Sequence, residues 1–195
     1  MGVRIGVLDL QGDVSEHIEA FRRALAESGL SEGSEVFTVR RADQIHSCDG
    51  LVIPGGESTT ISRLIDKNGM RKPLEEFGGG VFATCAGLIL LSKGVPDPRV
   101  KPLGLLDIDV KRNAFGRQKD SFEADLVIKG LGAPFHAVFI RAPVISRLGE
   151  GVEVLADVDG APVAVMQGKH LGLCFHPELS GDMRLHRMFL ENLTS

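Results

Sequence analysis

The chain has 195 residues, of which 43% are hydrophobic and 25% are charged, so we expect one soluble domain over residues 1–195 with a sizeable core. Its formal net charge of −4 argues against a nucleic-acid partner, which would need a basic excess to neutralise phosphates. No apolar run approaches the length of a membrane span, and the start Met1-Gly2-Val3-Arg4-Ile5 lacks the layout of a signal peptide.

The first half of the chain alternates short apolar runs with amphipathic segments. Asp13 is predicted to cap the first helix, with Glu16 as its capping-box partner, and Gly29 to end it. Further helices are predicted from about Thr59 to Asp66 and from Cys85 onward. Strands are predicted at Val3–Leu8, Val36–Val39, Leu51–Ile53 and Val81–Thr84. This rhythm indicates an α/β fold with a parallel sheet between helices on both faces.

The second half has few helix signals until a final helix at about Asp182–Asn192. We interpret its apolar runs as an antiparallel extension of the sheet edge, with the last strand returning near the centre. The polar stretch from Arg112 to Ser121 is predicted to be a loop. The expected strands are Leu105–Val110, Phe122–Ile128, Ala137–Ile140, Val152–Ala156, Val163–Gln167 and Leu171–Phe175. The predicted fold class is therefore a three-layer α/β/α domain whose central sheet is mostly parallel.

Three segments that follow predicted strands are expected to share one rim of the sheet. Gly12, Gly55-Gly56 and Cys85 each come just past a strand end. Because ligands bind at the carboxyl ends of strands in open parallel sheets, we expect the functional site at this rim.

Cys85 lies at a small-residue turn between two apolar runs, in Val81-Phe82-Ala83-Thr84-Cys85-Ala86-Gly87-Leu88. A strand that turns tightly into a helix presents the residue at the bend, which is the geometry of a nucleophile elbow. The positive end of the new helix would also favour the thiolate. The sequence therefore predicts a cysteine nucleophile at position 85.

A cysteine nucleophile needs a base, and Phe175-His176-Pro177-Glu178 supplies one near the end of the chain. Pro177 biases His176 toward extended geometry, in which residues two apart point to the same side. Glu178 can then accept a hydrogen bond from the ring of His176 and fix its tautomer. Each residue alone is more often a structural residue, but together they predict a Cys85–His176–Glu178 triad.

The segment Pro54-Gly55-Gly56-Glu57-Ser58-Thr59-Thr60 is a candidate oxyanion loop. Its double glycine lets backbone amides approach a ligand, and a glycine amide paired with the amide of Ala86 fits acyl transfer. A phosphate loop is disfavoured because no Gly-Lys-Ser/Thr follows. A plain turn before a capped helix remains an alternative.

The remaining cysteines and histidines are interpreted as structural. The three cysteines contain no Cys-x-x-Cys, which indicates free thiols, no metal and a reducing, cytoplasmic setting. Cys48 adjoins a turn and Cys174 lies inside an apolar strand. We expect the other histidines to be surface or core residues: His17, His46, His136, His170 and His186.

Taken together, Thr84-Cys85-Ala86-Gly87 and His176-Pro177-Glu178 resemble the class I, triad-type glutamine amidotransferases, whose fold is flavodoxin-like. Longer motifs resemble, more narrowly, the glutaminase subunit of pyridoxal 5′-phosphate synthase, from the first strand to the last helix. These motifs are Gly6-Val7-Leu8-Asp9-Leu10-Gln11-Gly12, Pro54–Thr60, Arg112-Asn113-Ala114-Phe115-Gly116-Arg117-Gln118, Ser121-Phe122-Glu123-Ala124 and Phe139-Ile140-Arg141-Ala142-Pro143.

The resemblance implies a glutaminase that releases ammonia from L-glutamine without a cofactor. It implies Cys85 as nucleophile, His176 as proton carrier, Glu178 as its orienting group, and the amides of Gly56 and Ala86 as oxyanion donors. Its implied glutamine-binding residues are Gly56, Glu57, Ser58, Arg112, Ile140 and Arg141, with one or both arginines pairing with the α-carboxylate.

The resemblance also implies a partner, a synthase subunit that consumes the ammonia. Nothing in the chain looks able to use ammonia itself, so we expect a channel between subunits and low activity in isolation. Gln11 is tied in this family to activation by the partner. We expect the first helix and the Gln11-Gly12 turn to form the contact, since they lie on the active-site rim.

Two alternatives remain at this point. The chain could be a glutaminase of another pathway, such as the histidine-biosynthesis amidotransferase, or a binding or regulatory module that kept the fold and lost the chemistry. Two positions depart from the family pattern: Ala83 stands where glycine is usual, so the turn must not need positive φ there, and Asp9 stands where a small residue is commoner.

Overall fold

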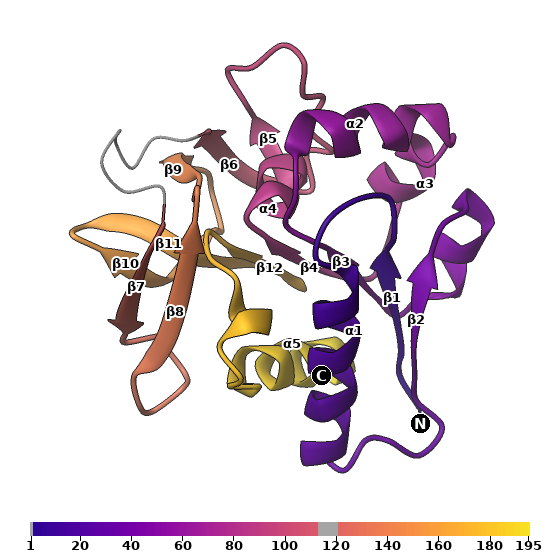
Figure 1. Cartoon of the computed structure of the whole chain (residues 1–195), viewed down its shortest axis with the longest axis horizontal. Helices are drawn as coiled ribbons and strands as arrows, with labels where there is room; N and C mark the ends of the chain where they lie inside the picture. Colours follow the sequence, from indigo (N-terminus) through magenta and orange to yellow (C-terminus); the bar gives the residue numbers. More distant parts are fainter. Residues whose placement is uncertain (1, 113–120) are drawn as a thin grey trace.

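A computed structural model of the chain describes residues 2–112 and 121–195 (Figure 1). Within these residues a seven-stranded sheet has the order β10-β11-β12-β4-β3-β1-β2. Its parallel part contains β1 (Arg4–Leu8), β2 (Glu35–Val39), β3 (Gly50–Ile53), β4 (Gly80–Thr84) and β12 (His170–Leu173). All residues of β3 and β4 are buried, as expected for strands covered on both faces. The predicted parallel sheet is confirmed.

The antiparallel extension is confirmed for the last three strands of this sheet. β10 (Glu153–Val158) pairs with β11 (Ala161–Gln167), which pairs with β12. β12 then lies parallel to β4, with Leu173 opposite Thr84. The last strand therefore returns to the centre of the sheet, and the residues that follow it come next to the end of β4.

Three other predicted strands do not join this sheet, which corrects the sequence interpretation. β6 (Leu106–Lys111) pairs with β5 (Ser92–Gly94) and β9 (Val144–Leu148), and β7 (Ser121–Leu126) pairs with β8 (Phe135–Ile140). The reason lies in their alternation of buried and more exposed positions. One apolar face suits a small sheet packed on the side of the domain, whereas a strand inside the central sheet needs two.

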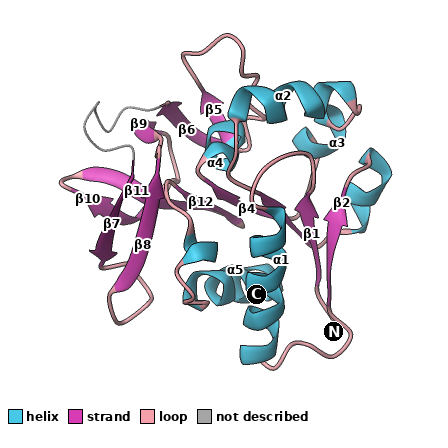
Figure 2. Ribbon diagram, viewed as in Figure 1, coloured by secondary structure: helices cyan, strands magenta, loops and turns pink. Residues whose placement is uncertain are grey.

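Helices cover both faces of the central sheet (Figures 1 and 2). α1 (Val14–Glu27) and α5 (Arg184–Thr194) contact each other on one side, and α2 (Ser58–Lys67) and α4 (Ala86–Leu91) contact each other on the other, with α3 (Arg71–Glu75) nearby. Short 3-10 helices occur at Ala42–Ser47 and Pro177–Leu179. The predicted three-layer α/β/α architecture is confirmed.

A cluster of phenylalanines joins α1 and α5 to the sheet. Phe21, Phe82 and Phe189 are fully buried or nearly so, and their rings pack edge to face with centroids 5.2 to 5.9 Å apart. The chain has no tryptophan or tyrosine, so phenylalanine supplies this packing. Each buried ring contributes roughly 1.5–3 kcal/mol through removal of its surface from water. The cluster fixes the position of α1 against β4.

Gly12, Gly55-Gly56 and Cys85 meet at one rim, as predicted. The amide of Asp13 reaches the carbonyl oxygen of Gly55 at 3.4 Å, and a Cβ on Gly12 (φ +114°) would overlap that same oxygen.

No helix within residues 2–112 and 121–195 is long and apolar enough to cross a membrane.

Candidate active site

Cys85 occupies a strained bend between β4 and α4. Its φ of 48° and ψ of −106° lie in a region that costs a non-glycine residue on the order of 1–3 kcal/mol. Its amide donates to the carbonyl oxygen of Leu173 at 2.9 Å, which holds the bend against the end of β12. A Cβ at Gly87 would overlap the carbonyl oxygen of Ile53, so only glycine lets α4 pack this closely on β3. The predicted tight bend from strand to helix at Cys85 is confirmed.

His176 follows β12, and its amide donates to the carbonyl oxygen of Val138 in β8 at 2.9 Å. Its Nδ1 lies 2.7 Å from Oε1 of Glu178, which is the contact predicted from the sequence. The backbone that produces this contact differs from the prediction. Pro177–Leu179 form a 3-10 helix rather than an extended segment, and this turn folds the Glu178 carboxylate back under the ring.

Cys85 and His176 line the same cavity, of about 240 Å³. Because Nδ1 of His176 faces carboxylates, Nε2 is the nitrogen left for the thiol. Burial by itself lowers the pKa of His176, but hydrogen bonds to Asp13, Cys85 and Glu178 outweigh burial and raise it well above its usual range. The arrangement therefore favours a charged imidazolium beside the cysteine.

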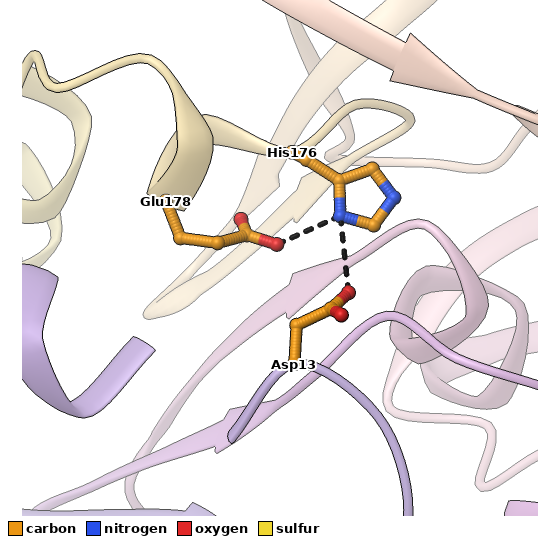
Figure 3. A group of neighbouring side chains, drawn as sticks. All are labelled: Asp13, His176 and Glu178. Atoms are coloured by element: carbon orange, nitrogen blue, oxygen red, sulfur yellow. Dashed lines mark hydrogen bonds and ion pairs between the residues drawn. The ribbon is translucent and has the colours of Figure 1, made fainter. Parts of the chain in front are cut away.

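Asp13 is a site residue that sequence reasoning assigned to a different role. As the N-cap residue of α1 it makes no side-chain capping hydrogen bond, so the predicted capping box is wrong. Its Oδ2 instead lies 3.4 Å from Nδ1 of His176 (Figure 3), and this hydrogen bond lowers the pKa of Asp13. The signal available in the sequence was its place directly after Gly12 on the predicted rim.

Asp13, His176 and Glu178 have ligand atoms that all lie within 4.8 Å of one another, a set that could hold a metal ion. The close approach of Nδ1 of His176 to Oε1 of Glu178 is explained by their 2.7 Å hydrogen bond and needs no metal. Burial raises the pKa of Glu178, and its hydrogen bond to His176 opposes this rise. The carboxylate thus depends on ring donors to stay ionised.

His17, predicted to be a surface or core residue, is a core residue that also contacts the candidate triad. Its ring is fully buried, with Nε2 3.4 Å from Oε1 of Glu178 and 3.1 Å from Oγ1 of Thr84. The same Thr84 oxygen accepts the amide of Gly55 at 3.1 Å. The apolar face of α1, which His17 shares with Phe21, was the sequence signal that placed this ring toward the sheet.

The candidate oxyanion loop is held by Gln11. Oε1 of Gln11 accepts the amide of Glu57 at 2.7 Å. Gly56 has a φ of 149°, and a Cβ there would come within 2.6 Å of that same oxygen. The first strand–helix turn therefore touches the loop directly.

The predicted ligand-binding residues gather around the cavity. The guanidinium of Arg112 pairs with Glu57, whose Oε1 lies 2.8 Å from Nη2. It also pairs with Asp97, a partner that the sequence analysis did not find. The thiol of Cys85 lies 3.6 Å from the carbonyl oxygen of Ile140. The next residue, Arg141, has a backbone φ of 46°, which is in the left-handed region. The cavity lining is Asp13, Gly56, Glu57, Ser58, Cys85, Ala86, Ile89, Arg112, Ile140, Arg141 and His176.

Other expectations have simple outcomes. Residues 113–118 of the Arg112–Gln118 motif lie outside the described residues. Ala83 lies in β4 and is not among the residues with positive φ, as expected, and Asp9 pairs with Arg40 at 2.6 Å. Burial raises the pKa of both Cys48, to about 11, and Cys174, which agrees with structural roles.

The fold and this site define a class of protein, the class I glutamine amidotransferases. A solved structure titled "Crystal structure of glutamine amidotransferase" is 47% identical, with a TM-score of 0.86, and the match covers 98% of this chain and 99% of that one. The chain also matches the SNO glutamine amidotransferase family over residues 7–195, and it belongs to that family. The family predicted from the sequence is confirmed.

Two similar relatives share one name. A pyridoxal 5′-phosphate synthase subunit PdxT of Methanosphaerula palustris is 61% identical over 193 residues, covering 99% of this chain and 98% of the relative. Another of the same name, from Methanoregula boonei, is 59% identical over 192 residues, covering 98% and 99% respectively. Both matches extend over nearly the whole length of this chain.

Proposed function

We propose that this chain is the glutaminase subunit of a pyridoxal 5′-phosphate synthase, and that Cys85, His176 and Glu178 are its catalytic triad. The observation that carries the proposal is the strained cysteine bend, which shares a cavity with a histidine whose other nitrogen is held by a buried carboxylate. Residues 1–195 act in it as a single glutaminase domain.

In the proposed reaction the thiolate of Cys85 attacks the carboxamide carbon of L-glutamine. His176 gives a proton from Nε2 to the leaving nitrogen, and ammonia departs as the glutamyl thioester forms. His176 then takes a proton from a water molecule while the water oxygen attacks the thioester carbon. This hydrolysis breaks the carbon–sulfur bond and releases glutamate and the thiol. Glu178 holds the ring in the required tautomer throughout.

The amides of Gly56 and Ala86 are the proposed oxyanion donors, since both residues line the cavity beside Cys85. Glutamine is held through Gly56, Glu57, Ser58, Arg112, Ile140 and Arg141. A guanidinium that pairs with the carboxylate of a neighbouring side chain also suits the α-carboxylate of the substrate. Glu57, which Arg112 would then release, could pair with the α-ammonium group.

The proposed partner is the synthase subunit that consumes the ammonia, in line with the name that the two relatives carry. Ammonia that escaped into water would be protonated and lose its nucleophilicity, so we propose a channel between the subunits. Gln11 is the proposed activation residue because it already bonds the amide of Glu57 in the oxyanion loop. The contact would involve α1 and the Gln11-Gly12 turn, in a cytoplasmic complex.

The proposal is tested by measuring glutamate release from glutamine with the synthase partner present. We expect Cys85→Ala to lower kcat by at least about 10³-fold, because the nucleophile is lost. Cys174→Ala is the matched control, since that thiol is buried and does not line the cavity, and this variant should keep its activity. Full activity of Cys85→Ala would contradict the assignment of the nucleophile, and equal wild-type rates with and without the partner would contradict activation.

A further inference from the structure

His17 lies behind the triad, on α1, and its ring is completely buried. One ring nitrogen, Nε2, meets two oxygens: Oε1 of Glu178 at 3.4 Å and Oγ1 of Thr84 at 3.1 Å. The other, Nδ1, has no hydrogen-bond partner among residues 2–112 and 121–195. The ring therefore has one polar side, and this side faces the candidate triad.

The surroundings of the ring decide which nitrogen carries the proton. Burial lowers the pKa of His17 well below its usual range, and the nearby histidines His186 and His176 add to this effect, so the ring is neutral with one N–H. A proton on Nδ1 would leave a buried donor unpaired and would aim a lone pair at the Glu178 carboxylate. A proton on Nε2 instead faces two acceptors, which makes the Nε2–H tautomer the favoured one.

Glu178 consequently lies between two imidazole rings. Its Oε1 is 2.7 Å from Nδ1 of His176 and 3.4 Å from Nε2 of His17. Because a buried carboxylate takes up a proton unless donors stabilise its charge, a second N–H at 3.4 Å adds a weaker contact to the 2.7 Å hydrogen bond from His176 and favours the ionised form of Glu178. An ionised Glu178 is the form that can hold the His176 ring.

The second acceptor of His17 links this network to the chain around the nucleophile. Thr84 directly precedes Cys85, and its Oγ1 accepts the amide of Gly55, the neighbour of Gly56. One ring on α1 thus contacts the residue before the bend and the carboxylate behind the base.

We propose that His17 is a positioning residue of the glutaminase site, whose Nε2–H holds the Glu178 carboxylate against His176 and ties α1 to Thr84. This inference rests on the proposed roles of Cys85, His176 and Glu178. It makes α1, the helix expected to meet the synthase partner, a direct support of the triad.

His186 offers a matched control for a purely structural role. It is also fully buried and lies on α5. Its ring stacks on that of Phe82 with centroids 5.0 Å apart, and the ring of His17 packs edge to face with the same phenylalanine with centroids 6.1 Å apart. Neither ring nitrogen of His186 has a hydrogen-bond partner within the described part of the chain. Replacing either histidine disturbs the same core, but only His17 touches Glu178.

The experiment compares His17→Phe, His17→Gln and His186→Phe by glutamate release with the synthase partner present, across a range of pH. We expect His17→Phe to lower kcat by about tenfold or more with little change in KM, the scale of one hydrogen bond to a charged group. His17→Gln should recover much of kcat, because its amide N–H can reach the same acceptors. His186→Phe should stay within about twofold of wild type, since it removes no contact with the triad.

The pH profile separates positioning from packing. Without its second donor, Glu178 becomes ionised only at higher pH, so the acid limb of kcat/KM should move upward in His17→Phe but not in His17→Gln or His186→Phe. If His17→Phe does not fold, as judged by its thermal transition, His17→Leu replaces it in the same comparison.

Two results would overturn the inference: an unchanged acid limb in the apolar variant, or equal losses of kcat in His17→Phe and His186→Phe. Cys85→Ala in the same assay keeps the two proposals apart. If it retained activity, the proposed triad itself would fail. If it were inactive while His17→Phe matched wild type, only the role of His17 would fail.

Discussion

At the scale of single residues, the unusual feature of this site is that two carboxylates approach one ring nitrogen. Glu178 is buried and lies 2.7 Å from Nδ1 of His176, whereas Asp13 is partly exposed at the cavity and lies 3.4 Å away. Glu178 has the shorter hydrogen bond and the fixed position, so it is the orienting group in our proposal. Asp13 adds negative charge beside the same ring.

Replacing Asp13 with asparagine should lower the pKa of His176, because a negative charge beside the imidazolium is lost. The proton of His176 would then be lost at lower pH than in wild type. A histidine NMR titration of isotope-labelled protein measures this directly. Asp9→Asn is the control, since Asp9 lies on the same strand–helix connection but pairs with Arg40. An unchanged His176 titration in Asp13→Asn would show that Asp13 does not act on the ring.

At the scale of elements, the junction between β4 and α4 decides where the thiol points. The junction combines a strained cysteine with a glycine that allows the helix to pack against β3. The sequence predicted this bend because an apolar strand runs directly into small residues. It could not predict the 3-10 turn at Pro177, because the same dipeptide also fits an extended segment.

Gly87→Ala tests this junction. The added methyl group would overlap the carbonyl oxygen of Ile53, and backbone cannot move aside as a flexible side chain can. We expect the free energy of unfolding to fall by roughly 2 kcal/mol or more, together with a loss of glutaminase activity. Gly78→Ala is the control, because a Cβ there would have nothing within 4 Å. Denaturant unfolding measures both variants, and similar stabilities for the two would contradict the packing argument.

At the scale of the whole molecule, the core contains histidines that must stay neutral. Burial lowers the pKa of His186 to about 3, from an ordinary value of 6.5. The folded state therefore binds fewer protons than the unfolded state between these values. The stability that this group contributes is fully present above pH 6.5 and is lost as the pH falls toward 3.

His186→Phe should make the protein less sensitive to acid. Between pH 5.5 and 4.5 the unfolding free energy of the wild type should fall faster than that of the variant by about 1.4 kcal/mol per pH unit, the value for one proton. Urea unfolding at several pH values measures the difference. Parallel pH dependences for the two proteins would mean that His186 is protonated in the folded state.

Local sequence patterns were sufficient to predict the layered architecture, the rim of the sheet and the residues expected to do chemistry there. Hydrophobic periodicity and turn residues are local signals, so they identified β1 to β4, the bend at Cys85 and the pairing of His176 with Glu178. Two features became clear only from the tertiary structure. The first is that β6, β7 and β8 pair outside the central sheet. The second is that Asp13, predicted as a helix cap, and His17, predicted as a surface or core residue, contact members of the triad. The physical reason is that these contacts join residues far apart in the chain, and only the packing of α1 against β4 and the turn after β12 brings them together.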